Sequence, residues 1–431
     1  MTSQHNIPDR TRMPSNGKTI DLHLKEPEQM VLDNGLPAYT IHAEEAEVTR
    51  VDIIYRAGSA YQNKKLTAAA TGKLLKEGTL GFTSSEIAAQ LDYVGAYCDV
   101  NTTKDSATLT LYTLTKHLEG LLPLIAELIS KATFPEHELV TYLEQKRHEF
   151  LINSEKVRYQ AMLEFNRLLF GASSAYGQVL EVDDFDLLKR EDLDEFYHRN
   201  YTSDSAYVII SGKADEKVTS LVNRYLGNDF LTANGLTSEI AFIGENGMRE
   251  KYIKKRETLQ SAIRIGRRIM NKLHPEYHKF VLLNTILGGY FGSRLMSNLR
   301  EDKGYTYGVS SSQINYIRGA AFSIATEVNA KHTRSAVEQI FKEMQRLREE
   351  KIDREELQTV KNYIYGTFLR NFDGPFALAD RFRSARDFGL GFDYYLDSLS
   401  KLMSVSADIL DTANNYLQPD DMIRLVVGNM E

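Results

Sequence analysis

The same order of predicted strands and helices occurs twice along the 431-residue chain, and this duplication restricts the fold to two similar halves. In the first half, residues 105–114 alternate small or polar with apolar residues, as a half-buried strand does, and two long helical stretches follow. In the second half, residues 320–328 take the same place before helical stretches at 333–350 and 354–371. The repeat spacing of about 215 residues is too long for a solenoid and indicates a duplicated domain.

Each half combines hairpins with segregated helices, which is typical of the α+β class. The pair Asn34-Gly35 stands between two strand-like runs and predicts a hairpin near the start of the first half. We therefore expect two homologous domains, each with a mostly antiparallel sheet and helices packed on one face. The expected divisions are an extended leader at 1–27, a first domain at 28–232, a turn-rich linker at 233–247 and a second domain at 248–431.

The charge balance and the cysteine count exclude several classes of protein. The formal net charge is −7, with 52 basic against 59 acidic residues, which gives no reason to expect nucleic acid or an anionic membrane as a partner. Cys98 is the only cysteine, so an internal disulfide is excluded and a reducing compartment is expected. The first residues are polar and no run of about 18 apolar residues occurs, so we expect a cytoplasmic protein.

Two segments carry the information about function. In the first, a strand at 51–59 ends in Gly58-Ser59 and leads into an alanine-rich helix that is closed by Gly78-Thr79. The second runs from Leu287 to Gly308 and contains a glycine-rich turn, then an arginine and a tyrosine seven residues apart, which are Arg300 and Tyr307.

On these segments, on the duplication and on His198-Arg199-Asn200-Tyr201, the chain resembles the pitrilysin/insulinase family of zinc metallopeptidases, in particular its bacterial two-domain members. The resemblance covers nearly everything after residue 27 and implies the fold of one half of a metallopeptidase clamshell. The family carries the inverted zinc motif H-x-x-E-H on the helix of the first segment. The string 287–308 corresponds to the signature of the family's second domain.

The resemblance implies that the zinc chemistry is missing from this chain. Counted back from Gly78-Thr79, the two histidine ligands would fall at Ala69 and Lys73, and the glutamate base at Gly72. The third ligand, a glutamate, would lie near Leu151. Zinc needs imidazole, thiolate or carboxylate donors, and its water needs a base. Glu149 is two residues away, which turns its side chain by about 200° around a helix.

The resemblance also implies a role for Arg300 and Tyr307, which in relatives contact the peptide across the clamshell. We therefore expect a catalytically inactive, substrate-binding subunit of a heterodimeric zinc endopeptidase. It would hold no metal or cofactor of its own, and a paralogous partner with an intact H-x-x-E-H would supply the zinc and the base. The open alternatives are a non-proteolytic homodimeric scaffold that binds peptides, and a peptidase with displaced ligands.

Three other patterns have structural explanations. His274 and His278 are spaced as on one face of a helix, but Pro275 indicates a helix start instead of a metal site. The glycine-rich turn at 287–292 follows a helix and lacks Gly-Lys-Ser/Thr, so we do not expect it to bind phosphate. Cys98 has no base near it in sequence, so no case for a nucleophile follows.

Overall fold

The computed structural model describes residues 26–228, 248–255, 258–407 and 409–430, together with Thr11 and Leu24. The predicted linker 233–247 lies outside the described residues, as does most of the predicted leader 1–27. Within the described part of the chain, no helix is both long and apolar enough to cross a lipid bilayer.

The first half forms a six-stranded sheet in the order β1-β2-β6-β3-β5-β4. Its strands are β1 (Glu28–Val31), β2 (Pro37–His42), β3 (Val48–Tyr55), β4 (Tyr97–Thr102), β5 (Ala107–Leu114) and β6 (Ala206–Gly212). All neighbours are antiparallel except β2 and β6, which run parallel. The predicted hairpin at Asn34-Gly35 is confirmed, because β1 pairs with β2 and Gly35 has a φ of 83°, a conformation that glycine adopts readily.

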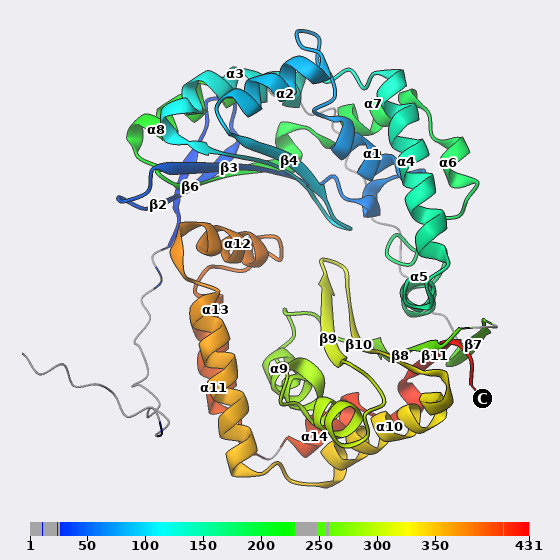
Figure 1. Ribbon diagram of the computed structural model, residues 1–431. Helices are drawn as coiled ribbons and strands as arrows, with labels where there is room; N and C mark the ends of the chain where they lie inside the picture. Colours follow the sequence, from blue (N-terminus) through cyan, green and yellow to red (C-terminus); the bar gives the residue numbers. More distant parts are fainter. Residues whose placement is uncertain are drawn as a thin grey trace, which may run out of the picture.

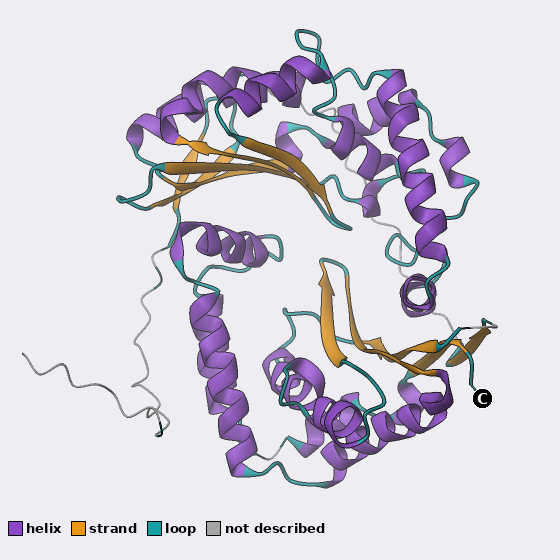
Figure 2. Cartoon of the chain, in the orientation of Figure 1, coloured by secondary structure: helices purple, strands orange, loops and turns teal. Residues whose placement is uncertain are grey.

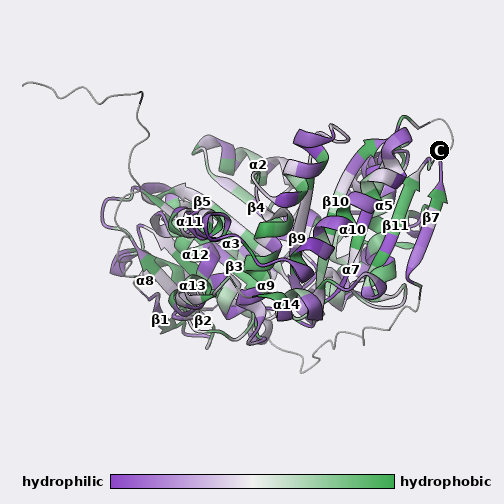
Figure 3. Ribbon diagram, turned by 90° about the horizontal axis from the view of Figure 1, so that it is seen from below, coloured by the Kyte–Doolittle hydropathy of each residue, from purple (hydrophilic) through white to green (hydrophobic). Residues whose placement is uncertain are grey.

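The second half forms a five-stranded sheet in the order β7-β11-β8-β10-β9. Its strands are β7 (Glu250–Lys254), β8 (Gln260–Arg268), β9 (Val309–Tyr316), β10 (Gly319–Asn329) and β11 (Ile423–Gly428). Only β7 and β11 are parallel, and β11 is largely hydrophobic, as a strand covered on both faces should be (Figure 3). The expected α+β class with two similar halves is confirmed.

The helices fall into two successive groups. Those of the first half are α1 (Thr67–Leu74), α2 (Ser84–Tyr93), α3 (Leu118–Ser130), α4 (Glu136–Ser154), α5 (Val157–Phe170), α6 (Asp184–Leu187), α7 (Arg190–Asn200) and α8 (Glu216–Leu226). Those of the second half are α9 (Tyr277–Asn284), α10 (Thr333–Glu349), α11 (Arg354–Arg370), α12 (Gly374–Arg386), α13 (Tyr394–Ser404) and α14 (Leu410–Tyr416). Two π-helical turns, Thr285–Gly289 and Met296–Asp302, follow α9.

Each sheet buries one face under helices of its own half. In the first sheet, Val51, Ile53 and Ile210 belong to a core that also contains the apolar face of α3. In the second sheet, Ile263 and Ile265 belong to a core shared with α9 and α10. Side chains two residues apart along a strand point to the same face, so these residues define one face of each sheet.

The opposite face of each sheet is covered by a single helix from the other half, which the expectation of helices on one face did not include. Helix α12 packs on the first sheet, where Phe382 lies 4.7 Å from Tyr39 between ring centroids. Helix α5 packs on β8 and β11, with Phe165 in one apolar cluster with Leu425 (Figures 1 and 2). The two halves therefore complete each other's cores, and we call these contacts the α12 joint and the α5 joint.

Candidate functional site

The positions at which the sequence analysis expects the family's zinc motif, Ala69, Gly72 and Lys73, lie on α1, and none of them offers a metal ligand. Ala69 is half-buried and Lys73 is half-exposed, with its ammonium 3.9 Å from the nearest oxygen of Asp99. Methyl groups and ammonium groups do not coordinate Zn²⁺. Among the described residues, no group of three or more His, Cys, Asp or Glu side chains is placed to hold a metal ion.

Gly72 is enclosed by the edge strand β4. A Cβ at this position would lie 2.4 Å from Thr102 Oγ1 and 3.2 Å from Val100 Cγ1. Real Cβ atoms do not approach other atoms as closely as the first of these distances, so even alanine would require Thr102 to move. The space that a glutamate side chain would need at residue 72 is filled by β4.

The expected position of the third ligand lies on helix α4, which contacts α1. Leu151 is 47% exposed and carries no donor atom. Glu149 is exposed and its carboxylate accepts a hydrogen bond from Lys146 at 2.7 Å, so it is engaged on the surface of its own helix. The residues at and around α1 therefore do not fit a zinc ion.

Three buried tyrosines lie together in this half of the molecule. The rings of Tyr55 and Tyr201 are 4.7 Å apart, and those of Tyr197 and Tyr201 are 5.7 Å apart. A Cβ on Gly72 would lie 3.5 Å from the Tyr201 hydroxyl, which places this cluster directly beside α1. Burial raises the pKa of all three phenols, so they stay neutral. The segment 198–201 therefore contributes a packing residue behind α1, which its sequence did not indicate.

In the second half, Arg300 is held in a defined direction by an aromatic ring. It lies in the second π-helical turn, and its guanidinium carbon is 4.7 Å from the ring centroid of Phe291. This turn is fixed to α10, because Asn298 donates to Glu343, and the residues just before it are fixed to α11, because Arg294 makes paired hydrogen bonds to Glu356. π-Helical turns are rare and often occur at functional sites.

Tyr307 is displayed to solvent from an anchored loop. Its side chain is 93% exposed, whereas the flanking Tyr305 stacks on His332 with centroids 4.4 Å apart. The hydroxyl of Thr306 donates to the carbonyl of Glu327 at 2.7 Å, which fixes the backbone beside Tyr307. An exposed phenol on a fixed backbone is available to bind a ligand.

Arg300 and Tyr307 line the same cleft, of about 1110 Å³. The opposite wall comes from the first half, at the connection between α4 and α5. An ion pair between Arg158 and Glu327, with N–O distance 3.7 Å, links the two walls. The structure thus brings together the two residues that the sequence singled out, and it adds Phe291 and the α4–α5 connection, which the sequence analysis missed.

The other residues that the sequence analysis considered, His274, His278 and Cys98, contribute to the fold and not to this cleft. His274 precedes α9 in a turn, and the buried His278 lies inside that helix, so the predicted helix start is confirmed. Burial lowers the pKa of His278 and raises the pKa of the Cys98 thiol to about 12, which keeps that thiol protonated and unreactive at neutral pH. Helix α2 begins with a capping box formed by Thr83 and Glu86.

Two family models match this chain. The model described as "Insulinase (Peptidase family M16)" matches residues 38–168, and the model described as "Peptidase M16 inactive domain" matches residues 188–364. The matched segments contain α1 and the Arg300–Tyr307 region, respectively.

Several proteins are similar over most of their length. The "Uncharacterized zinc protease YmxG" of Bacillus subtilis is 23% identical, with 82% of this chain and 87% of that protein covered. The "Non-peptidase homolog YmxG" of Helicobacter pylori is also 23% identical, with 88% of each covered. "Mitochondrial-processing peptidase subunit beta" of Saccharomyces cerevisiae is 20% identical, with 92% of this chain and 90% of that protein covered.

A solved structure shows the same fold. The peptidase M16 inactive domain from Pseudomonas fluorescens superimposes with a TM-score of 0.86 at 21% identity, and the match covers 94% of this chain and 98% of that one. Together with the two family models, which cover both halves, this similarity identifies the chain as a member of peptidase family M16, the insulinase or pitrilysin family.

Proposed function

We propose that this protein is the non-catalytic, peptide-binding subunit of a two-chain zinc endopeptidase. A paralogous partner chain would supply the zinc ion and the general base, and this chain would present Arg300 and Tyr307 to the peptide. The substrate would be a peptide or a small protein, and the assembly would act in a reducing compartment such as the cytoplasm, where the single buried Cys98 needs no disulfide partner.

The observation that carries this proposal is the contrast between Gly72 and Tyr307. The first is enclosed by Thr102 and has no room for the side chain of a base, whereas the second is almost fully exposed in a cleft with Arg300. Loss of zinc ligands alone would also suit a protein without function. The positioned Arg300 and the displayed Tyr307 favour a protein that still binds something.

The chemistry of the two side chains suits a peptide. A guanidinium donates paired hydrogen bonds to carbonyl or carboxylate oxygens, and stacking on Phe291 leaves its N–H edges available. A phenol hydroxyl can donate to the oxyanion that forms when a peptide carbonyl is attacked. Such groups lower a barrier only where another chain brings a nucleophile, which here would be the zinc-bound water of the partner.

The names of the relatives support the proposal and its main alternative. One relative is named as the beta subunit of a processing peptidase, which agrees with a protein of more than one subunit. Another is named a non-peptidase homolog, which agrees with a loss of catalysis. A homodimeric scaffold that binds peptides without cutting them is therefore the second candidate.

Metal analysis and peptide cleavage separate the candidates. The chain would be purified alone and together with the M16 paralogue with which it co-purifies, and each preparation would be analysed for zinc and assayed on a peptide library with a chelator control. We expect no stoichiometric zinc and no cleavage from the chain alone, and chelator-sensitive cleavage from the pair. One tightly held zinc per chain in the lone protein would refute the proposal, and a homodimer that binds peptides without cleavage would favour the scaffold.

Substitutions in the cleft test the role of the pair. Tyr307→Phe removes one hydrogen-bond donor, so kcat of the reconstituted enzyme should fall on the order of 10²-fold, as for loss of one oxyanion donor. Arg300→Ala should raise KM as well as lower kcat. The matched control is Tyr93→Phe on α2, since Tyr93 is 90% exposed and lies outside the cleft. Equal turnover of the Tyr307 and Tyr93 variants would contradict the assignment.

A further inference from the structure

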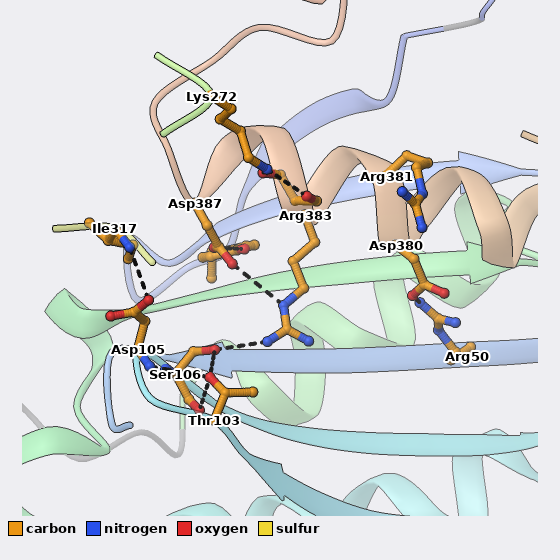
Figure 4. Close-up of polar contacts among 12 residues, drawn as sticks. Arg50, Thr103, Asp105, Ser106, Lys272, Ile317, Asp380, Arg381, Arg383 and Asp387 are labelled. Carbon is orange, nitrogen blue, oxygen red and sulfur yellow. Dashed lines mark hydrogen bonds and ion pairs between the residues drawn. The ribbon is translucent and has the colours of Figure 1, made fainter. Parts of the chain in front are cut away.

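A second cavity, of about 720 Å³, lies at the α12 joint. It is lined from the first half by the turn between β4 and β5, and from the second half by the turn between β9 and β10 and by α9, α12 and α13. Figure 4 shows the polar side chains of this region, which come from both halves. The site proposed above, with Arg300 and Tyr307, has no residue in common with this cavity.

The carboxylates of the cavity are already satisfied by protein groups. Asp105 accepts hydrogen bonds from Tyr176 Oη at 2.6 Å and from Ile317 N at 3.0 Å. Asp380 accepts a hydrogen bond from Arg50 at 2.6 Å. Asp387 accepts a hydrogen bond from Tyr207 Oη at 2.6 Å and lies 3.7 Å from the Arg383 guanidinium. These three negative charges therefore need no cationic ligand.

Three cations of the cavity, Lys104, Lys272 and Arg381, form no ion pair with a carboxylate of the described residues. The Lys272 ammonium donates to the carbonyl and the hydroxyl of Ser384, both at 2.9 Å, and lies 4.3 Å from the ring centroid of Phe388. All of these are neutral groups. Within the described residues, the Arg381 guanidinium makes no hydrogen bond or ion pair, and it is close enough to contribute to lowering the pKa of Lys272.

The electrostatic state of Lys272 agrees with an anion site. Burial is the main cause that lowers its pKa, to about 8; the negative charge of Asp387 opposes this shift, and the positive charge of Arg381 adds to it. An unpaired cation in a partly buried site is costly, and an anion bound beside it removes much of this cost. A bound carboxylate would thus stabilise the protonated form of Lys272.

The rest of the wall is aromatic. Six Phe and Tyr rings line the cavity, from Tyr277, Tyr316, Phe368, Phe388, Tyr394 and Tyr395. Burial raises the pKa of the tyrosines among them, so their rings remain neutral. A cavity with cations that form no ion pair and with an aromatic wall suits a ligand with one carboxylate on an apolar body.

We propose that this cavity binds the carboxylate of an amphiphilic acid through Lys272 and Arg381, with the apolar body of the ligand against the aromatic wall. A peptide that ends in an aromatic or aliphatic residue carries this chemistry, and so does a free aryl-alkyl carboxylate. The inference concerns the chain alone and does not depend on a partner subunit.

Calorimetric titration of the full chain at pH 7 tests the proposal with three probes: N-acetyl-Ala-Phe, its C-terminal amide and 3-phenylpropionate. We expect the peptide acid to bind at least tenfold more tightly than the amide. Tighter binding of the peptide acid than of 3-phenylpropionate would identify a peptide terminus as the ligand class, and the reverse would identify a free acid. Equal binding of acid and amide, or binding of none of the probes, would overturn the proposal.

Variants connect the binding to the two cations. Lys272→Met and Arg381→Gln should each weaken binding of the acid at least tenfold, and Lys272→Arg should retain much of it because the charge is kept. The exposed Lys116, which lies outside the cavity, gives the control Lys116→Met. Unfolding curves of every variant establish that the fold is intact, and unchanged affinity in folded Lys272→Met and Arg381→Gln would refute the site.

Discussion

The two joints that hold the halves together use different chemistry. At the α5 joint, Leu168, Leu169 and Phe170 of the helix share an apolar cluster with small and aliphatic residues of the second sheet and with Tyr316, and all three are at most 3% exposed. At the α12 joint, aromatic packing is combined with ion pairs, and Arg386 lies 4.5 Å from the rings of both Tyr39 and Tyr207.

The comparison shows that a helix packed on the sheet of the other half can contribute close packing, as α5 does, or can form the wall of a cavity, as α12 does. The centre of the α5 joint is stabilised by close packing, with ion pairs of Glu164 with Lys251 and of Arg158 with Glu327 beside it. A joint with hydrogen bonds and ion pairs depends on a few directional contacts, and the cavity lies beside these contacts. We therefore expect the α5 joint to contribute more to stability, and the α12 joint to govern pH dependence and binding in the cavity that contains Lys272.

The largest effect should come from the α5 joint. Phe170 is fully buried, so Phe170→Ala should lower the free energy of unfolding by about 3–5 kcal/mol, measured by urea denaturation. The counterpart at the α12 joint is Phe382→Ala, which should cost less because Phe382 keeps 9% exposure. A larger loss at Phe382 than at Phe170 would reverse the comparison.

A smaller effect is expected from a hydrogen bond of the α12 joint. The Tyr207 hydroxyl donates to the Asp387 carboxylate at 2.6 Å, so Tyr207→Phe should lower the free energy of unfolding by about 1.5–3 kcal/mol. Tyr112→Phe serves as the control, because Tyr112 packs on Phe376 of α12 while its hydroxyl makes no hydrogen bond within the described residues. Equal losses in the two variants would show that the hydrogen bond contributes nothing.

The pH dependence should reside in the α12 joint. The pKa of Lys272 falls from 10.5 to about 8 in the folded protein, so between these values the unfolded chain binds more protons than the folded one. Stability therefore gains from Lys272 deprotonation as pH rises through this window. The unfolding free energy of the wild type should therefore rise relative to that of Lys272→Met between pH 7 and pH 10. A constant difference between the two proteins would exclude this coupling.

The smallest effect should come from the exposed end of the same joint. Asp380 is paired with Arg50, but its side chain is 60% exposed, so Asp380→Asn should change the free energy of unfolding by less than about 1 kcal/mol. Asp52→Asn should cost more, because Asp52 is buried and binds both Arg50 and Thr110. Thermal melts of the two variants side by side measure this ranking.

The sequence was sufficient for elements whose pattern is local. The alternation at 105–114 predicted β5, and the Asn34-Gly35 pair predicted the hairpin between β1 and β2. The reciprocal joints could not be predicted, because the residues that cover α5 and α12 lie far away in the sequence and a helical pattern does not identify the sheet that it covers. The same limit applies to the close contact of Gly72 with β4, since that strand itself was not predicted.

The site residues show the same division. Their spacing and the family resemblance predicted a role for Arg300 and Tyr307, and the structure places both in one cleft. The ring of Phe291 under Arg300 and the anchoring of Thr306 depend on side-chain directions, which no spacing rule gives. The cavity with Lys272 and Arg381 is assembled from segments of both halves, so it had no sequence signal at all.

The enclosure of Gly72 by β4 also limits which side chains residue 72 can accept. A glutamate introduced at residue 72 would meet Thr102 and Val100, and its charge would lie beside buried phenols. This substitution alone would therefore destabilise the fold. Recovery of a zinc site would require changes in α1 and in β4 at the same time, with histidines at 69 and 73 still to follow. A zinc site engineered on α1 would therefore need a redesigned β4 before any ligand or base at residue 72 could be accommodated.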